Sequence, residues 1–514
     1  MHRFLLAALF LLMAGRIVPT WFVFNDTVDE QAHIVAGLEL LQSGRYEFEA
    51  QHPPLARFVV ALLPYFRAGL RREAHWLWDG GPWSSRPDSY YWYTLALARA
   101  GNLLFVAVAF VFVWLWSSRL FGHRAGLVAC LLLACCPNVL AHGGLATLDM
   151  AAAATVLAAA YCFWRWAESP RWRWCLASAL ACALAVLAKF SALLFLPPMA
   201  LAFWFLSRPK LGLAPVATFA LLTPSILWAG YRFEIGTVAP PGHHYLSMFP
   251  MGGESSPPRR LAHLLEGRTL PAPAFWKGLI DVSAHNHSGH PSYLLGRLSG
   301  WGWWYYFPVA LAVKTTLPLL LLVALALWFG DRRKLLHPLL GALLVLAISM
   351  TANINIGLRH VLSVYLFFAI LASGLLAASL SRRTTLVVAA LVVWHAAESV
   401  LAHPDYLPYF NEIARGREER FLADSNLDWG QDLARLGRYA QEHHIESLQL
   451  LHTGPTDPAK FHLHYQPLTG EPGWIAVSAN HLLGSDSKSA VIQRLRNRPP
   501  YARIGKSIWL YRVP

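Results

Sequence analysis

Apolar stretches long enough to cross a lipid bilayer recur through the first 400 residues of this 514-residue chain. Charged residues make up 14% of the sequence, well below the roughly 25% found in soluble domains. Inside a bilayer the backbone must satisfy its own hydrogen bonds, and a helix does so within one segment. The sequence therefore predicts a polytopic α-helical membrane protein.

About eleven membrane spans are expected from these stretches. They lie near residues 4–24, 98–116, 124–140, 149–165, 174–188, 191–207, 213–230, 303–328, 335–350, 358–379 and 384–402. No small-residue cleavage pattern follows Thr20, so the first segment is expected to stay as a membrane anchor.

The spans are interrupted by two long polar connections and followed by a polar tail. A transmembrane domain is expected over residues 1–402, with outer loops at about 25–97 and 231–300. Residues 403–514 are predicted to form a small α/β domain. Its expected elements are a helix at 429–441 and strands at 447–451, 474–477 and 507–511.

The net charge of +14 is gathered in short clusters between apolar segments. Every second short connection is basic, namely those at 119–124, 165–173, 208–210, 332–334 and 382–383. By the positive-inside rule these connections and the N-terminus are cytoplasmic. Both long loops and the C-terminal domain then lie on the extracytoplasmic side of a cytoplasmic (inner) membrane. The expected partner of the basic clusters is the membrane, and no nucleic acid is expected.

The first outer loop begins with acidic residues next to the membrane. A helix predicted over 28–43 has Asp29 and Glu30 in its first turn, and it carries Asp29 and His33 one turn apart on one face. Carboxylates at this place often cap a helix, and carboxylates close to a membrane are often functional. The stretch alone leaves both interpretations open.

Further charged residues stand where apolar segments begin or break. Asp149 opens a span, which is costly without a partner unless it caps the helix. Lys189 separates two apolar half-segments and either pairs with an anion or extends toward the interface. Arg359 and His360 open a span on the outward side, and a guanidinium binds phosphate oxygens in pairs. Together these groups fit a lipid-linked phosphate ligand and an acid–base step.

The second outer loop carries alternating histidines, His285, His287 and His290, which could bind a divalent metal. No cysteine or carboxylate ligand set surrounds them. We therefore expect no metal and no cofactor, and instead either polar contacts of the loop or contacts with the donor phosphate.

Taken in order, the motifs resemble those of lipid-carrier-dependent glycosyltransferases of the C-type fold. These include the protein O-mannosyltransferases, the bacterial transferases that attach aminoarabinose to lipid A, and a bacterial family-39-like subgroup. The resemblance is carried by Asp29-Glu30 with His33, His52-Pro53-Pro54-Leu55, Thr147-Leu148-Asp149, Lys189, Asn355-Ile356-Gly357-Leu358-Arg359-His360 and Asp424-Ser425-Asn426-Leu427-Asp428-Trp429-Gly430-Gln431-Asp432-Leu433.

The resemblance implies an inverting transferase. It would move a sugar from a polyprenyl-phosphate donor to a hydroxyl of a protein, lipid or glycan on the extracytoplasmic face. Asp29 is then the candidate base, and His52 replaces a lysine of the lipid A enzymes. The expected roles are catalytic for Asp29, Glu30 and Asp149, donor-phosphate binding for Lys189, Arg359, His360 and His52, and substrate binding for His33 and His287.

The alternative function is that of a flippase or transporter of lipid-linked sugars. A transporter is expected to have repeated halves and charges near the middle of the bilayer. No internal repeat is visible here, and the charged residues gather at one interface. These features favour the transferase.

Overall fold

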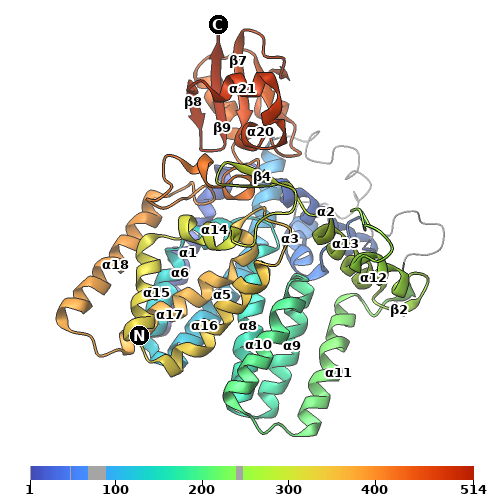
Figure 1. Ribbon diagram of the computed structural model, residues 1–514, viewed down its shortest axis with the longest axis vertical. Helices are drawn as coiled ribbons and strands as arrows, with labels where there is room; N and C mark the ends of the chain where they lie inside the picture. Colours follow the sequence, from blue (N-terminus) through green and yellow to red (C-terminus); the bar gives the residue numbers. More distant parts are fainter. Residues whose placement is uncertain (1, 47, 68–87, 239–246) are drawn as a thin grey trace.

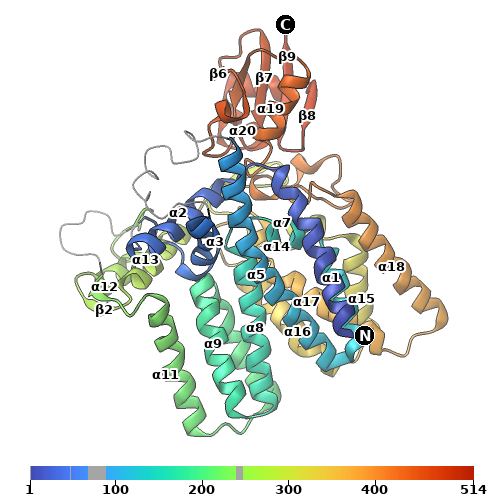
Figure 2. The same cartoon turned by 180° about the vertical axis from the view of Figure 1, so that it is seen from behind.

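The computed structural model describes residues 2–46, 48–67, 88–238 and 247–514. A bundle of long helices forms most of the molecule, and a small sheet domain stands on one end of it (Figure 1). Both views have the N-terminus at the opposite end of the bundle (Figures 1 and 2). The two ends of the chain therefore lie on opposite sides of the helical layer.

Each of the apolar segments predicted from the sequence is helical. The bundle helices are α1 (His2–Ile17) with η1 (Val18–Phe22), α5 (Asp88–Phe121), α6 (His123–Ala134), α7 (Pro137–Gly143), α8 (Asp149–Glu168), α9 (Trp172–Ala188), α10 (Ala192–Ser207), α11 (Leu213–Gly230), α14 (Tyr306–Lys314), α15 (Leu317–Phe329), α16 (Arg332–Ser349), η4 (Leu358–Val361), α17 (Ser363–Ser373) with η5 (Gly374–Ala377), and α18 (Arg382–Leu401).

By length and composition, the described residues include four helices able to cross a membrane, or six if each bent pair counts as one span. The two bent pairs are α6 with α7, at 70°, and α14 with α15, at 109°. In each pair, the second helix has a proline at its first or second position, namely Pro137 in α7 and Pro318 in α15. Proline disfavours the helical conformation of the preceding residue, which explains both breaks. The chain is a multi-pass membrane protein, as predicted.

The outer loops contain shorter elements. The first loop holds α2 (Val28–Ser43) and α3 (Pro54–Arg67), which pack against each other. The second holds β1 (Ile235–Thr237), α12 (Pro257–Leu265), β2 (Thr269–Pro271), α13 (Pro273–Ser288), β3 (Ser292–Leu294) and β4 (Arg297–Ser299). Strands β1 and β2 pair antiparallel, as do β3 and β4.

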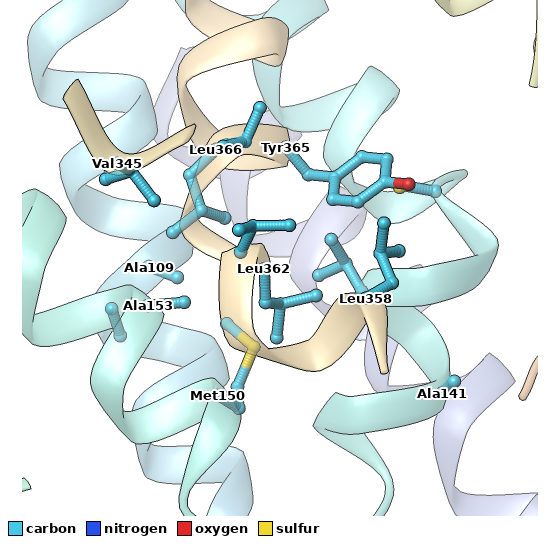
Figure 3. Packing of buried hydrophobic residues seen from close by; sticks show 14 of the residues in the cluster. Ala109, Ala141, Met150, Ala153, Val345, Leu358, Leu362, Tyr365 and Leu366 are labelled. Atoms are coloured by element: carbon cyan, nitrogen blue, oxygen red, sulfur yellow. The ribbon is translucent and has the colours of Figure 1, made fainter. Parts of the chain in front are cut away.

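Helix α17 lies in the centre of the bundle, where all of its residues except the partly buried Phe368 are buried. Figure 3 shows Leu362 and Leu366 packed among small side chains such as Ala109 of α5 and Ala153 of α8. The alanines allow neighbouring helices to approach closely, as small residues do in membrane bundles. Because α17 is fixed on every side, the short helix η4 directly before it is held in place as well.

The tail contains a five-stranded mixed sheet in the order β6-β5-β7-β9-β8. Strand β5 runs parallel to β6 and β7, whereas β9 runs antiparallel to β7 and β8. The elements are α19 (Leu433–Glu442), β5 (Leu448–Leu451), η8 (Pro458–Phe461), β6 (Tyr465–Pro467), β7 (Gly473–Ser478), α20 (Ala479–Leu483), η9 (Ser485–Lys488), α21 (Ala490–Arg496), β8 (Ala502–Ile504) and β9 (Ile508–Val513). The three predicted strands are β5, β7 and β9.

Residues 403–432 connect the bundle to the sheet and pack on the bundle. Nζ of the fully buried Lys314, at the end of α14, donates to the backbone oxygens of Leu407 and Asn426 at 2.7 and 2.6 Å. The predicted helix at 429–441 begins only at Leu433, because residues 429–432 form bends and turns instead. This connecting segment becomes part of the site described next.

Candidate active site

Four charged side chains from four separate segments form one chain of ion pairs. Nη1 of Arg359 bonds Oδ2 of Asp29 at 2.5 Å and lies 3.7 Å from Oδ2 of Asp149. The other carboxylate oxygen of Asp149 accepts a hydrogen bond from Nζ of Lys189 at 2.7 Å. The fold thus brings together four residues that the sequence analysis had to consider one by one.

All four side chains stand at helix ends. Asp29 lies in the first turn of α2, and Asp149 is the first residue of α8. Lys189 is the extended residue after α9, and Arg359 lies in η4, which precedes α17. The N-terminus of a helix favours negative charge, so the helix ends stabilise both carboxylates.

The two carboxylates of the ion-pair chain differ in their access to solvent. The side chain of Asp149 is 1% exposed and that of Arg359 is 9% exposed, whereas that of Asp29 is 29% exposed. Asp149, Lys189, Arg359 and His360 line a cavity of about 10 Å³, which is room for roughly one water molecule. Buried charges require partners, and Asp149 has two cations nearby. Asp29 is therefore the carboxylate of this chain that is most accessible to a ligand.

Glu30 lies outside the ion-pair chain and is fully buried. Its two oxygens accept hydrogen bonds from Nε and Nη2 of Arg99 at 2.8 Å each. They also accept the backbone N–H groups of Thr27 and Ala146, each at 2.8 Å. These bonds close the capping box of α2 and join α2 to the connection before α8. The contacts of Glu30 are those of a positioning group, and a catalytic role for it stays a prediction.

Two imidazoles lie beside the ion pairs, with the ring centroids of His33 and His52 5.6 Å apart. Burial is the main reason that the pKa of His52 falls to about 3, and Lys189 lowers it further. Burial also lowers the pKa of His33, together with Arg57, whose Nε donates to Nδ1 of His33. Both rings are therefore neutral near pH 7. Against a phosphate, His52 could act only as a neutral hydrogen-bond donor, which weakens the role predicted for it.

Arg57 and Arg99 were not singled out from the sequence. Besides His33, Arg57 bonds Tyr46 and the carbonyl oxygens of Glu49 and His52, and it pairs with the Glu49 carboxylate. It thereby orders the loop that carries His52. Neither arginine belongs to one of the sequence motifs. Their roles in positioning the loop of His52 and the carboxylate of Glu30 become visible only from their complete burial in the fold.

The histidines of the second outer loop do not converge on one point. Nε2 of His285 lies 3.2 Å from Nδ1 of His290, and Nδ1 of His285 lies 2.7 Å from Nε2 of Gln51. His287 lies beside Gly252 instead. Among the described residues, no group of three or more His, Cys, Asp or Glu side chains is arranged to hold a metal ion. Metal independence and a substrate role for His287 stay predictions.

The connecting segment forms another wall of the site. The guanidinium carbon of Arg359 lies 4.2 Å from the centroid of the Trp429 ring. The backbone oxygen of Trp429 accepts the N–H of Val28, the first residue of α2, at 3.0 Å. From the sequence, Trp429 is expected only as the first residue of a helix and as part of a motif, with no role in the site.

Part of the chain matches a known protein family. Residues 94–228 match the family model of dolichyl-phosphate-mannose-protein mannosyltransferases. That range includes Asp149 and Lys189, whereas Asp29 and Arg359 lie outside it. No curated protein matches the sequence.

Solved structures extend the likeness to the whole chain at the level of the fold. ArnT from Cupriavidus metallidurans is similar in its apo state, at 15% identity and a TM-score of 0.51, and when bound to undecaprenyl phosphate, at 14% and 0.50. Both alignments cover 97% of each chain. The S. cerevisiae protein O-mannosyltransferase complex bound to the sugar donor matches at 18% identity and a TM-score of 0.34, over 45% of this chain and 32% of that chain.

The resemblance predicted from the motifs is thus confirmed. Residues 94–228 carry the signature of the mannosyltransferase family, and the whole chain has the fold of ArnT. Its enzyme class is that of the glycosyltransferases that depend on polyprenyl-phosphate sugars.

Proposed function

We propose that this protein is an inverting glycosyltransferase. It moves a sugar from a polyprenyl-phosphate donor to an acceptor hydroxyl of a protein, lipid or glycan on the extracytoplasmic face of the membrane. The observation that carries the proposal is the Asp29–Arg359–Asp149–Lys189 chain. An accessible carboxylate beside two cations whose side chains are 9% (Arg359) and 17% (Lys189) exposed fits both a base and a phosphate-binding site.

Asp29 is the proposed base. A hydroxyl is a poor nucleophile near pH 7, so a positioned base must take its proton during the attack. The acceptor oxygen bonds the anomeric carbon while the bond from that carbon to the phosphate oxygen breaks. Because the attack comes from the side opposite the leaving phosphate, the configuration is inverted.

Arg359 and Lys189 are the proposed donor-phosphate ligands, with His360 beside them in the same cavity. Arg359 is bonded to Asp29, and its buried Nε has no hydrogen-bond partner among the residues that the structure describes. An arriving phosphate offers that Nε an acceptor and competes for the guanidinium. Donor binding would then release Asp29 to act on the acceptor. Asp149 stays bonded to Lys189 and orients it.

The orientation we propose has the N-terminus in the cytoplasm and the tail outside. All eleven apolar segments cross or enter the membrane, including α9, α10 and α17, which are shorter than a full span. The basic connections then share one side, and the ion-pair chain lies at the opposite interface. A flippase or transporter, with charges near the middle of the bilayer, fits this arrangement less well.

The test is transfer by the purified full-length protein in proteoliposomes. The donors are undecaprenyl-phosphate sugars in which the sugar is radiolabelled, and each is supplied separately. The label should move from the lipid to an acceptor fraction prepared from the envelopes of a strain in which the gene for this protein is deleted. Asp29→Asn is the matched inactive control. Movement of the labelled lipid between leaflets without release of sugar from the lipid would favour the flippase and contradict the proposal.

A further inference from the structure

A third carboxylate lies in the part of the connecting segment that is bonded to the loop of Arg359. Asp424 is half-buried, and its φ of 54° lies in the left-handed region that residues other than glycine rarely adopt. Its backbone N–H donates to Oδ1 of Asn480 at 2.8 Å, and its Oδ1 accepts the N–H of Ser425 at 2.6 Å. Unusual backbone conformations held in this way cluster at functional sites.

Two further bonds fix this turn against the loop that carries Arg359. Oγ of Ser425 donates to the backbone oxygen of Ile356 at 2.6 Å. The N–H of Leu358 donates to Oδ1 of Asn426 at 3.0 Å. A Cβ atom at Gly357 would lie 2.1 Å from the Ser425 hydroxyl, so only glycine permits this close contact. These bonds hold the turn that carries Asp424 against the loop that carries Arg359, and the charges of the two residues interact.

The charges around Asp424 do not balance. Asp29 is paired with Arg359 and Asp149 with Lys189. In the described part of the chain, no salt bridge or hydrogen bond joins Asp424 to a cation. Three carboxylates thus share two cations, and a donor phosphodiester would add another negative charge.

Uncompensated charge is costly in a partly buried site, and a like-charged neighbour favours the neutral form of an acid. The charged and titratable groups that influence Asp424 electrostatically are Asp29, Arg359 and the phenol of Tyr306 in other elements, and Asp428 in its own segment. Of the three carboxylates, Asp424 has the weakest pairing, so it is the one expected to keep a proton.

We propose that Asp424 acts as a neutral carboxylic acid at the donor phosphate, where it donates a hydrogen bond to a phosphate oxygen and protonates the oxygen that leaves the sugar. This inference rests on the proposed function. As the acceptor hydroxyl gives its proton to Asp29, the anomeric carbon–oxygen bond breaks and its electron pair stays on the phosphate. That oxygen takes the Asp424 proton, so the lipid phosphate leaves as a monoanion. Exchange with water then returns a proton to Asp424 and removes one from Asp29.

The acidity of Asp424 agrees with this role. Burial raises its pKa to about 7, against the opposing effect of Arg359. As the pH rises through this value, the carboxyl group loses its proton and can no longer donate a hydrogen bond. The hydrogen bond to phosphate should therefore be present at pH 6 and lost at pH 8.5.

The experiment measures binding of the monomethyl ester of undecaprenyl phosphate to the full-length protein at pH 6 and pH 8.5. The single charge of this phosphodiester does not change between these values. Wild-type affinity should fall roughly tenfold at the higher pH, the usual worth of a hydrogen bond to a charged group. Asp424→Asn stays neutral at both pH values, so it should show no pH dependence over this range. Glu446→Gln, which removes an exposed acid of the tail, should keep the wild-type dependence.

Equal wild-type affinity at both pH values would overturn the inference without any variant, as would an unchanged pH dependence in folded Asp424→Asn. Binding of the diester without pH dependence leaves the proposed function standing. No binding of the diester at either pH, together with no transfer by the wild type, would overturn the proposed function itself.

Discussion

The guanidinium of Arg359 lies on the face of the Trp429 ring, 4.2 Å from its centroid. Asp29 bonds the same guanidinium, and the backbone of Trp429 holds the first residue of the helix that carries Asp29. Trp429 thus contacts Arg359 and anchors the start of the helix that carries Asp29. A cation over an aromatic face is stabilised by about 2 kcal/mol when it is desolvated.

Trp429→Leu should therefore weaken binding of undecaprenyl phosphate by roughly tenfold, because it removes the surface that orients Arg359. Trp429→Phe keeps an aromatic face and should lose less. The measurement is titration of the purified variants with undecaprenyl phosphate. Equal losses in both variants would show that the ring acts through packing alone.

The sequence predicted the helical segments well because each depends on local apolar length. It also selected Asp29, Asp149, Lys189 and Arg359, because charges at the ends of apolar segments need partners. It could not pair them, since Asp29 and Arg359 are separated by 330 positions and meet only through the fold. It names Asp29 as the candidate base, but it could not show how the surroundings of Asp29 and Glu30 differ. Their difference arises from Arg99, an unremarkable arginine within an apolar helix until its burial is seen.

Glu30→Gln should damage the fold more than the chemistry. It leaves the buried Arg99 without a counter-charge, which typically costs 3–5 kcal/mol. Thermal unfolding in detergent should show a clear loss of stability. The double variant Glu30→Gln/Arg99→Gln removes both charges and should recover part of it. A stable Glu30→Gln protein that binds undecaprenyl phosphate but transfers no sugar would instead support a catalytic Glu30.

The orientation of the chain can be tested with single cysteines. The six native cysteines lie in the helices of the bundle or at their ends, and only Cys182 is not fully buried, so background labelling should be low. Asn497, after α21, and Lys210, between α10 and α11, are both exposed. An impermeant maleimide should label Asn497→Cys in intact spheroplasts and Lys210→Cys only after lysis. The opposite pattern would reverse the proposed topology.

Arg359→Ala should reduce the affinity for undecaprenyl phosphate by roughly 10- to 100-fold, since a charge-assisted hydrogen bond is worth about 1.5–3 kcal/mol. Arg359→Lys keeps the charge but loses the paired donors and the planar surface against Trp429, so it should recover only part of the affinity. Unchanged affinity in a folded Arg359→Ala protein would exclude this residue from the phosphate site.

Asp29→Asn separates binding from chemistry. The amide is nearly isosteric with the carboxylate, but it cannot take a proton from the acceptor hydroxyl. It also frees Arg359 from its ion pair, so undecaprenyl phosphate should bind at least as tightly as to the wild type. Transfer should fall by about 10² or more, the usual contribution of a positioned base. Asp149→Asn is the informative comparison, because the loss of its ion pair with Lys189 should weaken phosphate binding as well as turnover. Wild-type turnover in Asp29→Asn would move the base to another acid of the site.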